Sequence, residues 1–167
     1  TTEMRLVMID IVDNALIEHP HVSPTLFVDD LSSERSGDRT MVARQLGGFT
    51  NLVIARIQKD GMEVSTTKSV ISASTPSLGD DVKAELTHDS IPYSLRVKSL
   101  GVGLAAGVGR NTMVMQTRLK QFRKRLPRFR NLRRVGVNTA AIIRTGGVAA
   151  LMHGYAGLGV SPTMLMH

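Results

Sequence analysis

The sequence predicts an α+β protein, in which an antiparallel sheet with packed helices is followed by a basic helical region. Three observations carry this prediction. Apolar residues recur every three to four positions in residues 2–18 and 40–59, as in amphipathic helices. A stretch with strand character follows each of these segments. From residue 111 to residue 134 Arg and Lys are frequent, and the apolar residues return to helical spacing.

Composition limits the class of protein. The chain has 167 residues, 42% hydrophobic residues and a mean hydropathy of +0.00, which indicates a soluble globular domain. With no cysteine it has no disulfide framework and no thiolate metal site, so we expect an intracellular protein of the nucleus or cytoplasm. The first residues show neither an initiator Met nor a signal pattern, so we expect a piece of a longer protein.

Charge divides the chain sharply after Ser90. All 14 acidic residues precede this point together with eight basic ones, for a net charge of −6. The remainder has 13 basic residues and no acid. Such asymmetry indicates a phosphate-bearing partner, nucleic acid before membrane, because unneutralised cations repel one another. The alternative is a solvated basic face.

The first helix is expected over residues 2–18 and ends at Pro20. Residues 21–31 then have strand character, and the polar stretch 32–38 is expected to turn the chain. A second helix is expected over residues 40–59. Its cap is Asp38 or Thr40, and Gly61 ends it.

Beyond the second helix the pattern returns to strands. Residues 62–74 alternate like two strands joined by a turn at 66–68, and residues 75–81 are expected to form a loop. Residues 90–105 are typical of a further strand or a hairpin. A basic helix, or a helix pair broken near Pro127, is expected from residue 111 to 134, before a packed Gly-rich helical tail.

Two adjacent carboxylates end the first strand segment, in the sequence TLFVDDLS (residues 25–32). Neighbouring like charges are tolerated when they are solvated or share a cation. Carboxylates at a sheet rim can hold Mg²⁺ while the ion keeps waters and reaches substrate phosphates. Taken alone, Asp29 and Asp30 are better explained as a solvated turn, because adjacent aspartates in a turn are usually just solvated.

The order of later features favours the metal interpretation. FVDD (residues 27–30) precedes a helix, then GMEVSTTKS (61–69), KSLGV (98–102) and a basic helical region. This succession resembles the palm of reverse transcriptases, the RNA-directed DNA polymerases, particularly those of non-LTR retrotransposons. The resemblance covers residues 2–105. It implies a partial palm subdomain over residues 1–109 and a helical, basic, thumb-like region over residues 110–167.

The resemblance also implies residue roles. Two-metal nucleotidyl transfer would use two Mg²⁺ ions, with Mn²⁺ as an alternative, on template–primer and deoxynucleoside triphosphates. Asp29 would be the principal metal ligand and Asp30 its helper. Phe27 would pack beneath the primer end, and the hairpin around Leu100 and Gly101 would grip the primer. Lys68 would steady the leaving pyrophosphate, unless it is simply a solvated lysine.

One part of the family pattern is missing. The family needs another aspartate on an earlier strand and a substrate-binding motif before the Asp pair. Asp10 superficially resembles that aspartate, but it lies 19 residues before Asp29 and its surroundings have helical spacing. We therefore expect Asp10 and Asp13 on the polar face of a helix. The chain is expected to carry half of an active site and to be inactive alone.

The stretch from residue 118 to 134 carries nine basic residues among Leu and Phe. Such a helix is expected to contact template–primer phosphates without reading sequence. An anionic lipid surface or an acidic protein are its other possible partners. The rival to the polymerase hypothesis is a non-catalytic basic module that binds nucleic acid. The nine residues are Arg118, Lys120, Arg123, Lys124, Arg125, Arg128, Arg130, Arg133 and Arg134.

Two further patterns are set aside. Residues 145–167 carry no charged residue and are long enough to span a bilayer, but their five glycines, Pro162 and His153 make that span poor, so we expect no membrane partner. The histidines show no metal-ligand spacing and are expected to be surface or capping residues.

Overall fold

The computed structural model describes residues 2–88, 90–154 and 159. It confirms a mixed α+β chain with two small antiparallel sheets. The chain divides into two compact units, Thr1–Leu95 and Arg96–His167, hereafter unit 1 and unit 2. The division into a palm-like and a thumb-like part after residue 109 is an assignment by function and stays a prediction.

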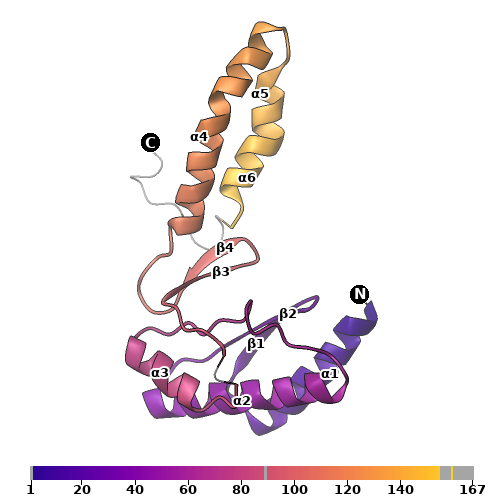
Figure 1. Ribbon diagram of the computed structural model, residues 1–167, viewed down its shortest axis with the longest axis vertical. Coiled ribbons are helices and arrows are strands. Elements are labelled where there is room, and N and C mark those ends of the chain that lie inside the picture. Colours follow the sequence, from indigo (N-terminus) through magenta and orange to yellow (C-terminus); the bar gives the residue numbers. More distant parts are fainter. Residues whose placement is uncertain (1, 89, 155–158, 160–167) are drawn as a thin grey trace. The chain divides into compact units, whose positions relative to one another are not determined.

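Unit 1 begins with helix α1 (Thr2–Glu18), followed by strands β1 (Ser23–Phe27) and β2 (Asp30–Glu34) and helix α2 (Arg39–Lys59) (Figure 1). Both predicted helices are confirmed. Asp38 caps α2, because its side chain accepts hydrogen bonds from Thr40 N and Met41 N. Asp10 and Asp13 are exposed on α1, as expected.

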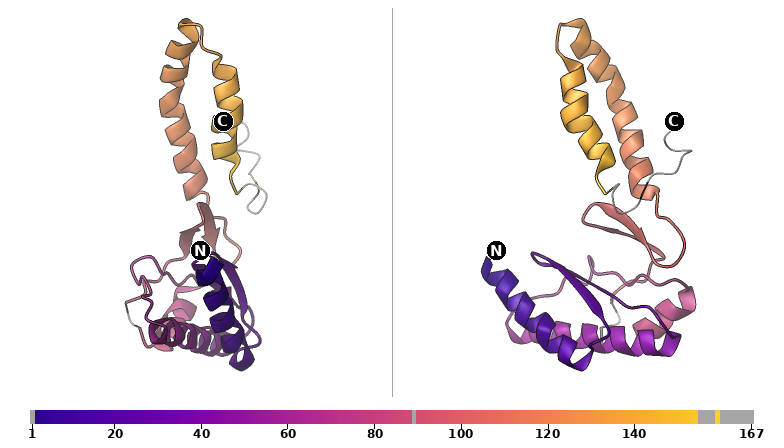
Figure 2. Two further views of the ribbon diagram at one scale, coloured as in Figure 1. Left: turned by 90° about the vertical axis from the view of Figure 1, so that its right-hand side faces the viewer. Right: turned by 180° about the vertical axis from the view of Figure 1, so that it is seen from behind.

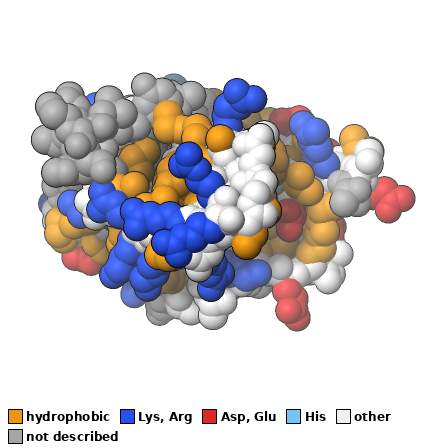
Figure 3. All heavy atoms as spheres, turned by 90° about the horizontal axis from the view of Figure 1, so that it is seen from above, with side chains coloured by type: hydrophobic (Ala, Val, Ile, Leu, Met, Phe, Trp, Pro, Cys, Tyr) orange, Lys and Arg blue, Asp and Glu red, His pale blue; other side chains and the backbone are white. Residues whose placement is uncertain are grey.

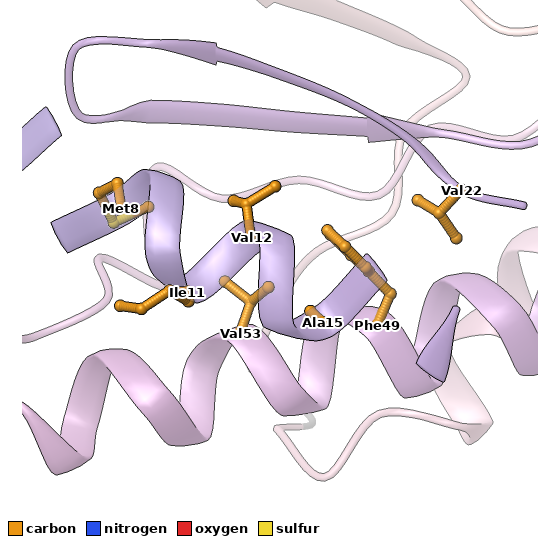
Figure 4. Packing of buried hydrophobic residues seen from close by; sticks show 7 residues of the cluster. All are labelled: Met8, Ile11, Val12, Ala15, Val22, Phe49 and Val53. Atoms are coloured by element: carbon orange, nitrogen blue, oxygen red, sulfur yellow. The ribbon is translucent and has the colours of Figure 1, made fainter. Parts of the chain in front are cut away.

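The core of unit 1 lies where α1 meets α2 and the β1–β2 hairpin. Figure 4 shows α1 between the hairpin and α2, with the buried side chains filling the space around it. Phe49 is the largest fully buried side chain, with 1% exposure. The cluster consists of Met8, Ile11, Val12, Ala15, Val22, Phe49 and Val53.

Close approach explains the glycine pair in α2. A Cβ at Gly47 would overlap the side chain of Glu85, and one at Gly48 would overlap the ring of His19. The two glycines thus leave room for Glu85 and His19 against α2.

The turn in the Asp-pair region was misplaced by sequence. Residues 32–34 belong to β2, and the chain turns at Val28 and Asp29 instead of after Leu31. The sequence gives no signal for a turn here, because Val28 and Asp29 are neither Gly nor Asn, the residues typical of two-residue hairpin turns.

Two further predictions in unit 1 are wrong. Most of the loop expected over residues 75–81 belongs to helix α3 (Pro76–Ala84): Thr75 caps it by accepting from Leu78 N, and Pro76 begins it. Residues 62–74 form no strand, only a turn at 66–68 and a single bridge between Ile71 and Tyr93. Val64 and Ile71 pack on a second small cluster, made by Ile54, Leu86 and Ile91, instead of pairing in a ladder.

An exposed ion pair joins α2 to α3. Arg39 donates to both carboxylate oxygens of Asp81, with Nη2 2.8 Å from Oδ1. The hydrogen bonds from Arg39 lower the pKa of the Asp81 carboxyl.

Unit 2 begins with a hairpin of strands β3 (Arg96–Ser99) and β4 (Val102–Ala105), which confirms the hairpin expected over residues 90–105. Helix α4 (Met113–Arg134) follows. It is one continuous helix with Pro127 inside it, so the alternative of a helix pair is wrong. The chain then returns alongside α4 through α5 (Thr139–Ile142), the π-helical turn η1 (Ile143–Gly147) and α6 (Val148–Met152) (Figure 2).

This helical hairpin has two arms: α4 is the first, and the run of α5, η1 and α6 is the second. The half-buried ring of Phe122 in α4 lies against the second arm. Phe122 and Phe129 of α4 contact each other with ring centroids 6.0 Å apart. A Cβ at Gly147 would lie 2.7 Å from the Phe122 ring, so the arms approach closely there. Among the described residues no helix is long and apolar enough to cross a bilayer. Most of the stretch 145–167, weighed above as a span, lies outside them.

Candidate metal and nucleic-acid site

The Asp pair lies at the end of the β1–β2 hairpin. Phe27 pairs with Asp30, which leaves Val28 and Asp29 as a two-residue turn. Val28 has a φ of 60°, a backbone conformation that is strained for a β-branched residue. Both aspartates are exposed. The hairpin therefore presents two carboxylates to solvent on a strained turn.

Packing on the core orients this hairpin. Leu26 pairs with Leu31, and both pack against the core cluster of unit 1. Because side chains alternate along a strand, Phe27 and Asp30 project from the opposite face. Phe27 is 58% exposed, which is high for a phenyl ring. The outer face of the hairpin thus carries an aromatic ring directly opposite a carboxylate.

The carboxylate oxygens of Asp29 and Asp30 are the type of ligand that magnesium binds, but two side chains are fewer than a full set of ligands. Carboxylate oxygens are ligands that Mg²⁺ prefers, and the ion normally keeps several waters. Within the described ranges no group of three or more His, Asp or Glu side chains could enclose a metal ion. Asp29 and Asp30 can therefore supply only part of a metal site.

Lys68 lies on the turn at residues 66–68, as expected, and its side chain is exposed. Its backbone N donates to Ser65 O at 3.2 Å. The strands expected on either side of this turn are absent, so the turn belongs to an irregular segment. The role of Lys68 toward pyrophosphate stays a prediction.

In unit 2, residues Leu100 and Gly101 form the turn of the β3–β4 hairpin, with φ of 47° and 79°. This turn contacts both arms of the helical hairpin. Arg118 Nη2 donates to Gly101 O at 2.6 Å, and His153 Nε2 lies 3.1 Å from Leu100 O. The structure therefore joins two predicted site elements, the turn and the basic helix.

The basic side chains of α4 form an exposed set. Figure 3 looks down on the tip of the helical hairpin and shows Lys and Arg side chains gathered there. A shallow hollow on this helix is lined by Gln116, Leu119, Lys120, Arg123 and Lys124. Arg118 is the half-buried member of the set. The exposed ones are Lys120, Arg123, Lys124, Arg125, Arg128, Arg130, Arg133 and Arg134.

Sequence reasoning missed two residues of unit 2. Asn111 is 3% exposed, and its amide group donates to Val97 O and Leu104 O at 2.9 and 3.1 Å. Its position just before a helix was the one available signal. His153, expected to be a surface or capping residue, contacts the turn 53 residues away in sequence, which no local pattern could indicate.

Comparison of the chain with known protein families, with curated proteins and with solved structures finds no match.

Proposed function

We propose that this chain is the C-terminal part of the palm and the beginning of the thumb of an RNA-directed DNA polymerase. The observation that carries this proposal is the Asp29–Asp30 pair at the strained turn of a hairpin whose inner face is fixed in the core. A solvated turn needs neither the strain nor the exposed ring of Phe27 beside the carboxylates.

Backbone strain supports the proposal independently of the charges. A positive φ at a non-glycine residue costs on the order of 1–3 kcal/mol and persists where surrounding structure imposes it. Here the Leu26–Leu31 pair anchors the strands, and the short turn leaves Val28 little choice. Such strain concentrates at functional sites.

Each residue then has a chemical task. Asp29 would hold the ions, Asp30 would assist it, and Phe27 would support the primer end. The metal ions would lower the pKa of the primer 3′-hydroxyl and offset charge on the departing pyrophosphate. Lys68 is proposed to bind that pyrophosphate. Since Asp29 and Asp30 fall short of a full ligand set, the remaining carboxylate comes from another part of the polymerase, and the chain alone is inactive.

The nucleic-acid partner is assigned to unit 2. Its 13 cations and lack of acid favour phosphate contact, and the exposed face of α4 supplies most of them. The Leu100–Gly101 turn adds the primer contact. Binding of this kind depends on salt and not on sequence.

The test measures Mn²⁺ affinity by titration calorimetry in the presence of a primer–template duplex and a deoxynucleoside triphosphate. Asp29→Asn is expected to weaken Mn²⁺ binding by about tenfold, since it removes a charged ligand. The matched control is Asp13→Asn, an exposed acid on α1. Equal affinities for wild type, Asp29→Asn and Asp13→Asn would contradict the polymerase proposal.

The second candidate is a non-catalytic nucleic-acid-binding module, favoured by the charge of unit 2 alone. In that case, duplex affinity falls on joint replacement of Arg123, Lys124 and Arg125 by Gln, and Asp29→Asn changes neither duplex nor Mn²⁺ affinity. The two candidates therefore differ in the metal dependence of binding.

A further inference from the structure

The Leu100–Gly101 turn holds a conformation that its sequence does not favour. Leu100 has a positive φ of 47°, where a side chain is disfavoured, whereas Gly101 at 79° carries no such cost. Leu100 is also 49% exposed, so burial of its side chain does not explain the conformation. The two-residue connection between Ser99 and Val102 requires positive φ at this turn, and contacts to its carbonyl oxygens hold the turn in place.

Arg118 makes the central contact. Its guanidinium donates through Nη2 to Gly101 O at 2.6 Å and through Nη1 to His153 O at 2.9 Å. One planar group therefore bridges the β3–β4 turn and the end of α6, and both bonds are charge-assisted. Arg125 of the same helix is exposed, whereas Arg118 is half-buried.

Residues at the end of the second arm contact the same turn. His153 Nε2 lies 3.1 Å from Leu100 O, and a Cβ at Gly154 would lie 2.6 Å from Val102 Cγ2. The turn thus contacts α4 and the end of α6, while the Leu100 side chain stays exposed.

Asn111 fixes the opposite end of the hairpin. Its Nδ2 bonds Val97 O and Leu104 O, and its Oδ1 accepts from Met113 N at 3.2 Å. Gly103 gives it room, since a Cβ there would lie 2.7 Å from Asn111 O. The β3–β4 hairpin is therefore tied to α4 at both ends.

We propose that Arg118 is a positioning residue: it holds the Leu100–Gly101 turn against α4, so that the turn and the cations of α4 bind the nucleic-acid backbone as one rigid surface. This inference rests on the proposed nucleic-acid binding of unit 2. It assigns Arg118 a different task from phosphate contact, the one expected of it from sequence.

The test compares charge-conserving variants on a short DNA duplex, measured by fluorescence anisotropy over a range of salt concentrations. Arg118→Lys keeps the charge and loses the planar two-pronged bridge. We expect it to weaken binding by about tenfold with an unchanged salt slope. The control Arg56→Lys, at an exposed arginine of α2 in unit 1, is expected to leave affinity unchanged.

Neutral variants separate positioning from phosphate contact. Arg125→Gln should weaken binding and lower the salt slope by about one unit, as loss of one phosphate contact does. Arg118→Gln should weaken binding and leave the slope close to that of wild type. A slope lowered by about one in Arg118→Gln, with normal affinity in Arg118→Lys, would overturn the inference.

A second measurement needs no nucleic acid. Backbone ¹⁵N relaxation should show rigid Leu100 and Gly101 amides in the wild-type chain and order parameters below about 0.6 in Arg118→Lys, with the α4 amides unchanged. Loss of order throughout unit 2 would instead indicate a general structural role and would refute the inference. If the turn loosens as expected but the wild type binds no duplex, the proposed function fails and the bridge by Arg118 stands.

Discussion

Unit 1 and unit 2 are stabilised in opposite ways. Every buried hydrophobic residue of the described chain lies in unit 1, from Met8 to Ile91. In unit 2 the buried polar side chains are Asn111 and Thr139, while the apolar residues of α4 are half-buried or exposed. Unit 1 is held by burial of apolar surface, and unit 2 by hydrogen bonds and partial contacts between its two arms.

The charges follow the same division. Unit 1 carries a net charge of −6 and unit 2 a net charge of +13. Repulsion among cations opposes folding, and unit 2 has little buried apolar surface to offset it. A polyanion that neutralises these cations would stabilise the unit that binds it. Under the proposed function, unit 2 depends for its stability on a phosphate-rich partner more than unit 1 does.

The largest expected effect comes from the core of unit 1. Phe49→Ala removes its one fully buried large side chain and should lower the free energy of unfolding of unit 1 by about 3–5 kcal/mol. Amide hydrogen exchange, resolved by residue, measures this loss. Protection in α4 is expected to persist.

Phe122→Ala is the matched change in unit 2. Its ring is only partly buried, so the loss should be roughly half as large or less. An equal loss of unfolding free energy in Phe49→Ala and Phe122→Ala would contradict the claim that apolar burial stabilises unit 1 more than unit 2.

The second prediction concerns the hydrogen bonds of unit 2. Asn111→Ala leaves the carbonyls of Val97 and Leu104 without their partner and should cost about 2 kcal/mol, seen as faster amide exchange in β3 and β4. Asn131→Ala, at an exposed position of α4, is the control and should cost a few tenths of a kcal/mol. No difference between the two variants would argue against a hydrogen-bonded unit 2.

Two glycines sharpen the contrast in packing. Gly47→Ala in α2 would push Cβ into Glu85 and should destabilise unit 1 by about 1–2 kcal/mol. Gly146→Ala in unit 2 meets nothing within 4 Å and should stabilise the second arm by about 0.5–1 kcal/mol. Thermal unfolding followed by circular dichroism measures both. A stabilising Gly47→Ala would show that α2 and α3 are not closely packed.

The smallest effect is electrostatic. The pKa of Asp81 is lowered by its hydrogen bonds from Arg39, so the pair stabilises the fold above the ordinary carboxyl pKa and loses this contribution as pH falls through the lowered pKa. Asp81→Asn should therefore cause a slight loss of stability at neutral pH and none in strong acid. Urea unfolding at both pH values is the measurement, and a loss that grows with acidity would contradict the sign.

How far the sequence predicts the structure also differs between the units. In unit 1 both long helices were predicted, because their apolar periodicity reflects a real core around Phe49. The turn at Val28 could not be placed, since a β-branched residue at positive φ gives no turn signal. Helix α3 was missed although Thr75 and Pro76 are typical of a helix start.

In unit 2 the basic helix and the hairpin were predicted, but their connection was not. Arg118 and the other cations of α4 look alike in sequence, and only the fold shows that Arg118 bonds Gly101 and His153. Contacts between residues so distant in the chain leave no trace in local periodicity. For the candidate site, the sequence supplied the residue types, and the structure supplied the strained turn and the bridge.

The most direct test of the account is to ask where a divalent ion sits when nucleic acid is bound. With a primer–template duplex and a deoxynucleoside triphosphate present, substoichiometric Mn²⁺ should selectively broaden the backbone amide resonances of Val28 to Leu31 in the full chain. Asp29→Asn should abolish this broadening. Broadening spread evenly over the acidic surface of unit 1, or confined to its other carboxylates, would contradict the central claim.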